Sequence, residues 1–414
     1  MAKVKNNLHL CFIFFIKREK LYTKLLMNYH LKNGENKMYI QMKTLFPLLS
    51  IILSNLMFAS PVSSAPLIFH SEGMKAKVEL VAEGLGVPWG MVFLSPDKIL
   101  VTEREGAIKL LDIENEKSIS LNNVPKVMDN GQGGMLDVAL SPDYKTTGWI
   151  YFTYVKNVKG KGATVLARTK LNNNSFNHWQ ELLVSKSTTS KSHHFGSRIA
   201  FDKNGHVFFA IGDRGERPNA QDLTNHAGSI IRLNLDGSIP ADNPFVQHKQ
   251  ALPEIWSYGH RNPQGLAFDA EYNRLWEIEH GPRGGDEINL ILPAANYGWP
   301  VISYGKEYWG PIAVGEGTHR EGMQQPVKIY DPSIAPASLI IYSSDAFPKW
   351  KGNLFSGALK LQHINRIVLD KEGRAIKEER LLENMEERIR ALAQSPKGWI
   401  YFSTDSGKIY RVRP

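Results

Sequence analysis

The sequence predicts an all-β protein folded as a six-bladed β-propeller, and two observations lead to this fold. One theme recurs along the chain: an apolar strand, a turn rich in Asp, Pro, Gly or Lys, and a second apolar or aromatic strand. The turns of its six copies fall near Asp97, Asp143, Asp202, Asp269, Asp345 and Lys397. Their spacings of 46, 59, 67, 76 and 52 residues each leave room for one four-stranded sheet with loops of variable length.

Within each copy the apolar residues alternate with the two-residue period of strands, and the turns have the composition of hairpins. In chain order the copies are "WGMVFLSPDKILVTEREGAIKLLD" from Trp89, "GMLDVALSPDYKTTGWIYFTYV" from Gly134, "SRIAFDKNGHVFFAIGD" from Ser197, "PQGLAFDAEYNRLWEIEHG" from Pro263, the looser "SLIIYSSDAFPKWKGNLFSGAL" from Ser338 and "RIRALAQSPKGWIYFSTDSGKIYRV" from Arg388. The same pattern fits a pair of β-sandwiches or an open β-solenoid. A propeller needs its ring closed, and we expect residues 76–85 ("AKVELVAEGL") to pair with the last blade.

The N-terminal segment has the features of an export signal. Residues 42–65 ("MKTLFPLLSIILSNLMFASPVSSA") combine Lys43, an apolar run from Leu45 to Phe58 and small residues up to Ala65. The run of 14 residues is shorter than the roughly 20 that a membrane span needs, although an uncleaved anchor is the alternative. We interpret residues 1–41 as a non-native extension, 42–65 as a signal peptide and 66–414 as one propeller domain without stable membrane insertion. The expected location is periplasmic or secreted.

The leader also explains the basic charge of the chain, which is +9 over 414 residues. Residues 1–65 hold nine Lys/Arg and two Asp/Glu, so the remainder carries 41 basic against 39 acidic side chains, a formal charge of +2. A nucleic-acid partner is therefore not expected. The one cysteine, Cys11, also lies in the leader, so neither a disulfide nor thiol chemistry is expected in the domain. We expect a monomer or a homodimer.

Two short segments next to predicted strands carry candidate catalytic side chains. "SKSHHFGSRIAF" places His193 and His194 just ahead of a strand. No further ligand stands at a metal-like spacing, so a general base is a better use of one imidazole than a metal site, and a structural or surface histidine is the alternative. "EIWSYGHRNPQGLAF" offers His260, Arg261, Asn262 and Gln264 within five residues, either as a polar ligand clamp or as a turn fixed by Asn-Pro.

Other candidates are scattered. Gln132 stands among three glycines, where the backbone can approach a ligand closely. Lys360, Arg388 and Arg390 would together attract carboxylates, whereas each alone fits a solvated surface charge.

The segment "IEHGPRGGDEINLILPAANYGWP" (278–300) concentrates glycines and two adjacent carboxylates, Asp286 and Glu287. Calcium takes six to eight oxygen ligands and readily accepts main-chain carbonyls. No "DxDxDG" pattern is present, so this is not an EF-hand loop. The residues by themselves leave a flexible surface loop and a calcium-binding loop equally open.

Five long motifs in the right order carry a family resemblance: "GQGGMLDVALSPDY", "HHFGSRIAF", "AQDLTNHAGSIIRLNLDGSIPADNPF", "EIWSYGHRNPQGLAF" and "EHGPRGGDEINLILPAANYGWP". Over residues 78–413 the chain resembles the soluble aldose sugar dehydrogenases of the glucose/sorbosone dehydrogenase family, which depend on pyrroloquinoline quinone (PQQ). The resemblance implies a six-bladed propeller that binds PQQ, a catalytic calcium and a structural calcium. It also implies oxidation of an aldose at the anomeric carbon to the lactone.

The resemblance also assigns roles. His194 matches the catalytic base, and Arg261 matches the arginine beside the reactive quinone carbonyl. The positions that match cofactor contacts are Gln132, Asn262, Gln264, Lys360, Arg388 and Arg390. The carbonyls of Gly281 and Pro282 match ligands of the catalytic calcium, those of Glu287 and Tyr297 match ligands of the structural calcium, and Asp286 is expected to support the loop.

Two features of the sequence bear on these roles. His193 departs from the family pattern, which often has Asp or Asn there, and a second imidazole is expected to change the pH dependence. The chain has no CxxCH haem motif, so electrons are expected to leave to an external acceptor. The alternative functions are a calcium-dependent propeller lactonase, with side-chain carboxylates at the channel, and a non-catalytic sugar- or protein-binding propeller.

Overall fold

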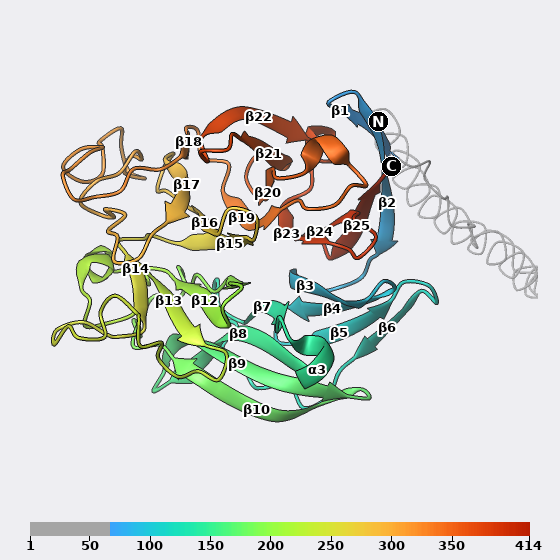
Figure 1. The fold of residues 1–414 in the computed structure, drawn as a ribbon, viewed down its shortest axis with the longest axis horizontal. Helices are drawn as coiled ribbons and strands as arrows, with labels where there is room; N and C mark the ends of the chain where they lie inside the picture. Colours follow the sequence, from blue (N-terminus) through green and yellow to red (C-terminus); the bar gives the residue numbers. More distant parts are fainter. Residues whose placement is uncertain (1–66) are drawn as a thin grey trace, which may run out of the picture. The chain divides into compact units, whose positions relative to one another are not determined.

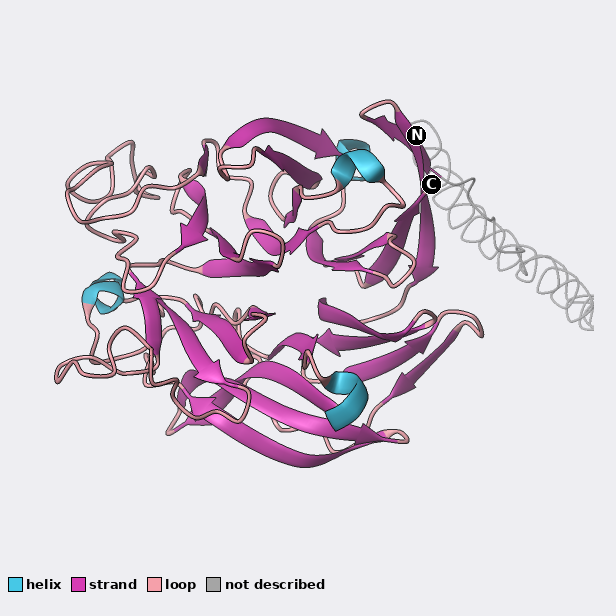
Figure 2. Ribbon diagram, in the orientation of Figure 1, coloured by secondary structure: helices cyan, strands magenta, loops and turns pink. Residues whose placement is uncertain are grey.

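The computed structural model describes residues 67–414, which all belong to one compact unit. They form six β-sheets arranged as blades around a central axis, so the predicted six-bladed β-propeller is confirmed (Figure 1). Figure 2 shows how little of this part of the chain is helical. The helical segments are α3 (Tyr144–Thr147) and the 3-10 helices η1 (Arg217–Gln221), η2 (Pro348–Trp350) and η3 (Glu383–Met385). The predicted leader segments 1–41 and 42–65 lie outside the described residues.

None of the helices in residues 67–414 has the length and apolar character needed to cross a lipid bilayer.

Each blade is an antiparallel sheet whose first strand is the innermost one. Blade 1 consists of β3 (Pro88–Ser95), β4 (Lys98–Glu103), β5 (Ile108–Asp112) and β6 (Lys117–Ser120). Blade 2 consists of β7 (Met135–Leu140), β8 (Trp149–Val158), β9 (Lys161–Asn172) and β10 (Ser175–Val184). Blade 3 consists of β11 (Ile199–Phe201), β12 (His206–Ile211), β13 (Ser229–Asn234) and β14 (Ile255–Tyr258). Blades 4 and 5 are β15 (Pro263–Asp269), β16 (Arg274–Glu279), β17 (Asp286–Ile291) and β18 (Lys328–Tyr330); and β19 (Pro336–Ile341), β20 (Leu354–Ala358), β21 (Ile364–Leu369) and β22 (Ala375–Leu381). Blade 6 joins both ends of the domain: β23 (Ile389–Gln394), β24 (Ile400–Thr404), β25 (Lys408–Arg413), β2 (Met74–Ala82) and β1 (Leu67–Ser71).

The predicted copies of the repeat coincide with the blades. Trp89 lies in β3 and Pro263 opens β15, and the predicted turns fall between the first and second strands of every blade. The strict alternation fails in inner strands such as β12, where "VFFAI" is buried without interruption. Each blade is packed between two others, so both faces of its inner strands lie in core and can be apolar.

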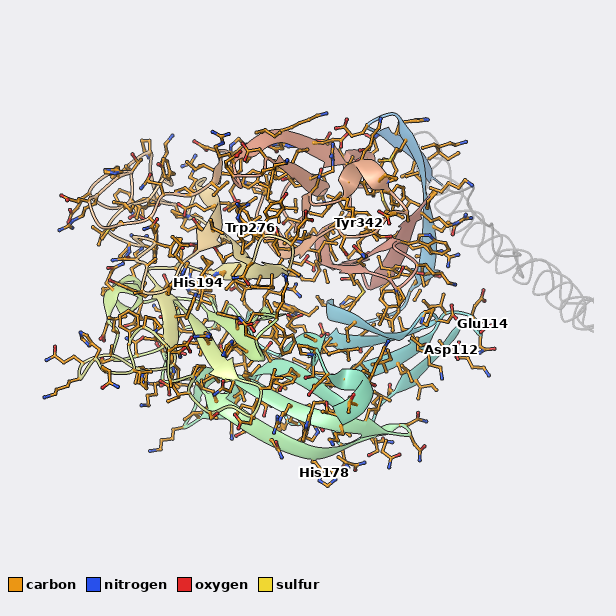
Figure 3. The ribbon with its side chains drawn as sticks, in the orientation of Figure 1. Asp112, Glu114, His178, His194, Trp276 and Tyr342 are labelled. Atoms are coloured by element: carbon orange, nitrogen blue, oxygen red, sulfur yellow. The ribbon has the colours of Figure 1, made fainter. Side chains whose placement is uncertain are left out.

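The core is accordingly divided among the spaces between adjacent blades. Trp276 of blade 4 packs with Leu354 of blade 5, and Tyr342 of blade 5 packs with Phe402 of blade 6. Figure 3 labels Trp276 and Tyr342, both fully buried. Stability is thus spread around the ring, and every blade depends on its two neighbours.

The ring is closed by the N-terminal strand. β2 pairs antiparallel with β25, with Val78 opposite Val412, so the predicted pairing of segment 76–85 with the last blade is confirmed. Glu79 fixes the register, because its carboxylate accepts hydrogen bonds from Arg411 Nε and Arg413 Nε, both at 2.8 Å. Sheet closure leaves no inner strand without a neighbour on either side.

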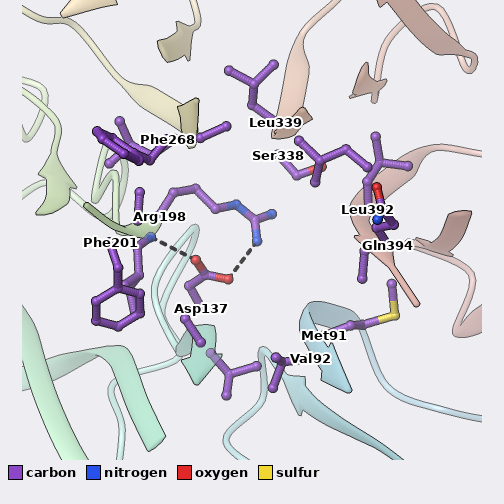
Figure 4. Close-up of a pocket in the computed structure, with 18 of the residues that line it drawn as sticks. Met91, Val92, Asp137, Arg198, Phe201, Phe268, Ser338, Leu339, Leu392 and Gln394 are labelled. Carbon is purple, nitrogen blue, oxygen red and sulfur yellow. Dashed lines mark hydrogen bonds and ion pairs between the residues drawn. The ribbon is translucent and has the colours of Figure 1, made fainter. Parts of the chain in front are cut away.

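The inner strands surround a cavity of about 470 Å³ on the propeller axis, and a buried arginine crosses it (Figure 4). Arg198 Nη1 lies 2.9 Å from Asp137 Oδ1 of blade 2, and its guanidinium stacks 3.9 Å from the centre of the Trp89 ring of blade 1. Nε donates to the Gln264 carbonyl of blade 4 at 3.0 Å, and Nη2 donates to the Arg390 carbonyl of blade 6 at 3.1 Å. One side chain, which precedes β11 of blade 3, therefore links five blades.

We expect Arg198→Met to destabilise the domain strongly, because Asp137 would stay buried without its partner. Burial already raises the pKa of the Asp137 carboxyl, and the Arg198 charge opposes that shift. Breaking a buried pair costs about 3–5 kcal/mol of unfolding free energy, measurable by urea denaturation. Arg374→Met, which breaks an exposed ion pair with Asp370, is the control and should change little. Equal, small effects of both substitutions would contradict a role of Arg198 as a link between blades.

Candidate active site

The candidate site lies where the inner strands begin. Gln132 precedes β7, His194 precedes β11, and Arg261 precedes β15. Contacts join them: the Gln132 side-chain oxygen accepts the His194 N–H at 2.8 Å, and the Arg261 carbonyl accepts the Asp213 N–H at 2.9 Å. The structure therefore brings candidates from three blades to one end of the ring.

His194 is held by a buried carboxylate. Its Nδ1 lies 2.7 Å from Asp213 Oδ1, and Asp213 Oδ2 accepts the Trp299 indole N–H at 2.7 Å. The backbone of His194 is left-handed, with φ 58°, a conformation that costs energy in a residue with a side chain. Gly212 permits this geometry, because a Cβ there would lie 2.5 Å from the His194 carbonyl oxygen.

Burial lowers the pKa of His194 to about 4, although the hydrogen bond to Asp213 pulls it upward and the charge of Arg261 pushes it further down. The imidazole is therefore neutral at neutral pH. For Asp213, burial raises the pKa, but the hydrogen bond from His194 and the nearby Arg261 charge outweigh burial, so its pKa is lowered. The pair is a neutral base oriented by an ionised carboxylate.

His193 lies beside this pair. Its ring meets that of His194 edge-on, with centroids 4.5 Å apart. Burial lowers the pKa of His193 as well, and the carboxylate of Asp213 partly opposes this. Its positive charge, when present, disfavours protonation of His194.

Arg261 is buried and points along the 280–281 backbone. Nη1 donates to the carbonyls of His280 at 2.9 Å and Gly281 at 2.7 Å. Its own N–H and that of Asn262 donate to Glu279 Oε2 at 2.6 and 3.1 Å, which fixes the turn into β15. Sequence reasoning placed Arg261, Asn262 and Gln264 together, and the structure has Gln264 Nε2 donating to Asn262 Oδ1 at 3.2 Å.

The basic candidates gather around a carboxylate that the sequence analysis did not single out. Arg388 Nε and Arg390 Nε each donate to Asp405 at 2.8 Å. Arg388 Nη1 also donates to the Leu359 carbonyl at 3.0 Å, which brings it next to exposed Lys360. Burial raises the pKa of Asp405, but the two arginines outweigh burial and hold its pKa below the usual range. Two arginines thus share one carboxylate, so this pair of arginines keeps an excess of positive charge.

The glycine-rich segment after β16 is largely buried and anchored by hydrogen bonds, unlike a solvent-exposed surface loop. Asp286 is fully buried and accepts hydrogen bonds from Gly281 N–H at 2.9 Å, Ser333 Oγ at 2.7 Å and Ala335 N–H at 2.9 Å. A Cβ on Gly281 would lie 2.1 Å from the Gly285 carbonyl oxygen, so this position requires glycine.

Behind this segment lies a buried acidic cluster. Glu277, Glu279 and His260 place one ligand atom each within 4.8 Å of one another. The Asn289 amide donates to Glu277 at 3.1 Å and to Glu279 and Glu287 at 3.4 Å, but its two hydrogens cannot satisfy three carboxylates. Glu277 Oε1 and Asn289 Oδ1 have no hydrogen-bond partner within residues 67–414.

Burial and the neighbouring Glu279 charge raise the pKa of Glu277 and of Glu287 well above the ordinary range. A cavity of about 10 Å³, roughly the size of one ion or water, adjoins the cluster. The cavity is lined by Arg261, Glu279, His280, Gly281, Gly285, Glu287, Tyr297, Trp299, Ile302 and Ser303. Gly281, Glu287 and Tyr297 line this one cavity, although the resemblance assigns Gly281 to one calcium and Glu287 and Tyr297 to another. Pro282 is buried in the adjoining loop.

Sequence reasoning missed four acidic residues at this site. Asp213 and Asp405 each follow the second strand of a blade, in "IGDRG" and "STDSG". Neither segment resembles a catalytic motif, so the sequence carries no signal for them. Glu277 and Glu279 offered a clearer signal: two carboxylates at alternate positions of an apolar strand face the same side and enter the core together.

Comparisons with known proteins find relatives along most of the described chain. The model of the "Glucose / Sorbosone dehydrogenase" family matches residues 85–411. The chain is 37% identical over 373 residues to the aldose sugar dehydrogenase YliI of Escherichia coli, covering 88% of this chain and 96% of that protein. It also superposes on the apo-form of the soluble aldose sugar dehydrogenase of Escherichia coli, with a TM-score of 0.79 and 35% identity over 82% of this chain and 99% of that one.

A second solved structure is that of a cofactor-bound form. The PQQ-bound aldose sugar dehydrogenase of Streptomyces coelicolor matches with a TM-score of 0.68 and 26% identity, over 84% of this chain and 99% of that one. The family model and the relative from Escherichia coli both match most of this chain, and both point to the same family. This chain therefore belongs to the glucose/sorbosone dehydrogenase family.

Proposed function

We propose that this protein oxidises an aldose at its anomeric carbon to the lactone, with PQQ and calcium as cofactors and an external electron acceptor. The observation that carries the proposal is the buried, neutral His194, held by Asp213 beside Arg261. The names of the relatives, an aldose sugar dehydrogenase and a PQQ-bound one, support the substrate and the cofactor. In the reaction the anomeric carbon loses a hydride and its hydroxyl loses a proton.

His194 is the proposed base for that proton. Nδ1 is engaged by Asp213, and Nε2 makes no hydrogen bond to any described residue, so Nε2 is the nitrogen open to a hydroxyl. Asp213 then stabilises the imidazolium that forms. Arg261 places a fixed positive charge next to the base, where it would stabilise negative charge on a neighbouring oxygen.

The side chains present fit PQQ, which has three carboxylates. Arg388 and Arg390 carry an excess of positive charge over Asp405, and Lys360 would add a third cation for the carboxylates. Gln132, Asn262 and Gln264 would add amide contacts near the axis. When bound, PQQ supplies the acceptor for the hydride and calcium supplies a Lewis acid.

The oxygen donors also fit calcium. The carbonyl of Gly281 accepts one hydrogen bond from Arg261 and has a second lone pair for a cation, and the Pro282 carbonyl lies next to it. For the structural cation we propose the carbonyls of Glu287 and Tyr297. The unpartnered Glu277 Oε1 favours this, because a divalent cation would satisfy the buried carboxylates around it.

We further propose a periplasmic or secreted protein, on the basis of the signal-like segment 42–65. A monomer or homodimer remains our expectation for its oligomeric state.

The lactonase alternative is disfavoured by where the carboxylates lie. Glu277 and Glu279 are buried in blade 4, and Asp137 on the axis is paired with Arg198, so these three do not offer calcium to a substrate in the channel.

Reconstitution tests the function directly. Full-length protein is loaded with PQQ and calcium, and reduction of a dye by aldoses is followed. We expect His194→Ala to lose at least about a hundredfold in turnover while still binding PQQ, because general-base catalysis contributes about that much or more. His193→Ala, the matched control, should keep most of the rate. If His193→Ala is inactive and His194→Ala is active, then His193 and not His194 is the base. If the wild type oxidises no aldose, the proposed function is refuted.

The pH dependence gives a second test. Only neutral His194 can accept a proton, so kcat/KM should fall on the acid side with a pKa near 4. Asp213→Asn removes the groups that raise this pKa, so the limb should move to lower pH, with a lower rate throughout. His193→Ala removes a charge that lowers it, so the limb should move to higher pH. A wild-type limb near pH 6.5 would be inconsistent with the buried pair.

Calcium binding should be linked to protons. Because the pKa values of Glu277 and Glu287 are raised, these carboxyls hold protons until a cation displaces them. Calcium should therefore raise the Tm more at pH 8 than at pH 6. Glu277→Gln should reduce the calcium-dependent gain, whereas Glu181→Gln, a surface partner of Lys156, should retain it. A calcium effect independent of pH and of Glu277 would place the cation elsewhere.

A further inference from the structure

Arg214 follows Asp213 in the loop after β12, and its side chain is fully buried. Its guanidinium donates to three main-chain carbonyls. Nη1 donates to the carbonyl of His193, and Nη2 donates to the carbonyls of Lys191 at 3.0 Å and Gly162 at 3.5 Å. Burial lowers the pKa of Arg214 to about 10, although the charge of Asp213 partly opposes this, so the side chain stays a cation at neutral pH.

A charged side chain of this kind is a costly way to fill a core. Arg214 Nε has no hydrogen-bond partner within residues 67–414, and the carbonyls that bind the two Nη atoms are neutral. Burying a charge on these terms costs far more than burying an apolar side chain of the same volume. Arg214 is therefore explained by what it holds in place, which is the stretch of chain around the candidate base.

This stretch is residues 189–195 ("TSKSHHF"), which we call the base segment. The base segment contacts Arg214 from its first residue to its last. Thr189 Oγ1 donates to the Arg214 carbonyl at 2.8 Å, and the Arg214 guanidinium lies 3.4 Å from the centre of the Phe195 ring. Together with the two carbonyls of the segment that bind the guanidinium, these contacts wrap the base segment around one side chain.

The backbone next to the base is unusual and needs an anchor. The base segment belongs to neither β10 nor β11. His194, Gly196 and Ser197 all have positive φ, of 58°, 64° and 97°. In residues that carry a side chain this conformation costs energy, and it persists only where the surroundings fix it. Arg214 supplies that restraint at the His193 carbonyl, which belongs to the peptide bond that enters His194.

Arg214 and Asp213 act on the same histidine from one loop. Asp213 Oδ1 lies 2.7 Å from the ring Nδ1 of His194, whereas Arg214 fixes the main chain just before that residue. Because Asp213 and Arg214 are adjacent, the ring and the backbone of the base are held by one short piece of chain. The guanidinium binds the main chain of His193, so His193→Ala leaves this contact intact.

We propose that Arg214 is a positioning residue for the base, which keeps the His194 imidazole against Asp213 and out of solvent. Its effect on catalysis rests on the proposed function, whereas its effect on the imidazole does not. Without Arg214 the base segment would relax, and the His194 side chain, now 12% exposed, would enter water. Burial is the main cause of the low pKa of His194, ahead of the charges of Asp213, Arg261 and His193 that face it, so this pKa would rise toward its ordinary value.

The test uses full-length Arg214→Met loaded with PQQ and calcium. We expect kcat to fall about a hundredfold with little change in KM, because a small misplacement of a catalytic group costs about that much. The acid limb of kcat/KM should move from near pH 4 toward about pH 6.5, the ordinary pKa of histidine.

Arg232→Met is the matched control. Arg232 is also buried in blade 3 and stacks on an aromatic ring, that of Trp256 at 4.6 Å, but its side-chain partners include Asp242 and Asn243 and lie outside the base segment. Its loss should lower the Tm without moving the acid limb. A lower Tm with an unmoved limb in Arg214→Met, or an equal shift in both variants, would overturn the positioning role.

A second variant decides the question if Arg214→Met does not fold. Phe195→Leu removes the ring under the guanidinium and keeps the carbonyls that bind it. The acid limb should then move in the same direction by a smaller amount, and a limb that stays in place would overturn the proposal.

NMR titration of the imidazoles in protein without PQQ gives a readout that does not need activity. The His194 signal is identified by its loss in His194→Ala. The wild-type ring should titrate near pH 4, and the ring in Arg214→Met should titrate closer to about pH 6.5. Equal values in the two proteins, or a wild-type value already near the ordinary one, would contradict the role of Arg214. If the wild type oxidises no aldose, the proposed function fails, and the titration still decides on Arg214.

Discussion

The ion pair of Arg198 with Asp137 on the propeller axis is the constraint on which the candidate site depends. The same guanidinium binds the carbonyls of Gln264 and Arg390, so it holds two backbone segments that carry proposed cofactor contacts. A buried charge pair is seldom the most stable way to fill a core. Here it sets the relative positions of blades that share no strand, and a hydrophobic residue of the same volume could not hold the two carbonyls.

Positive and negative side chains are separated in the candidate site, with the positive ones toward blade 6 and the negative ones within blade 4. Toward blade 6, Arg388 and Arg390 share one carboxylate and keep an excess of positive charge. Within blade 4, Glu277, Glu279 and Glu287 gather around a single amide and keep an excess of acidic groups. Arg261 and His194 lie between them. One region of the site therefore has an excess of positive charge and another has an excess of acidic groups.

The sequence predicts the blades well, because each is built from a contiguous segment whose turn and apolar pattern are local properties. Trp89 and Pro263 mark inner strands for this reason. It also predicts that His194 and Arg261 are functional, since both stand at strand entries in motifs of a known family. Asp213 contacts His194, 19 positions away, and Asp405 contacts Arg390 and Arg388, 15 and 17 positions away. The sequence does not predict these two residues because their roles depend on such distant contacts and not on a local pattern.

Closure of the ring by β2 and β25 joins residues 332 positions apart, such as Glu79 and Arg411. β25 follows every other described strand in chain order, so blade 6 cannot be completed before all the other strands are available. Until then β2 presents an unpaired edge, and Ala76 and Val78, buried in the finished ring, remain open to solvent. A partly folded chain can therefore hold five formed blades while the sixth is still open, and such a species is exposed to edge-to-edge aggregation. Pairing of β2 with β25 is the one step that removes this edge, so any change that weakens their register leaves the whole ring open.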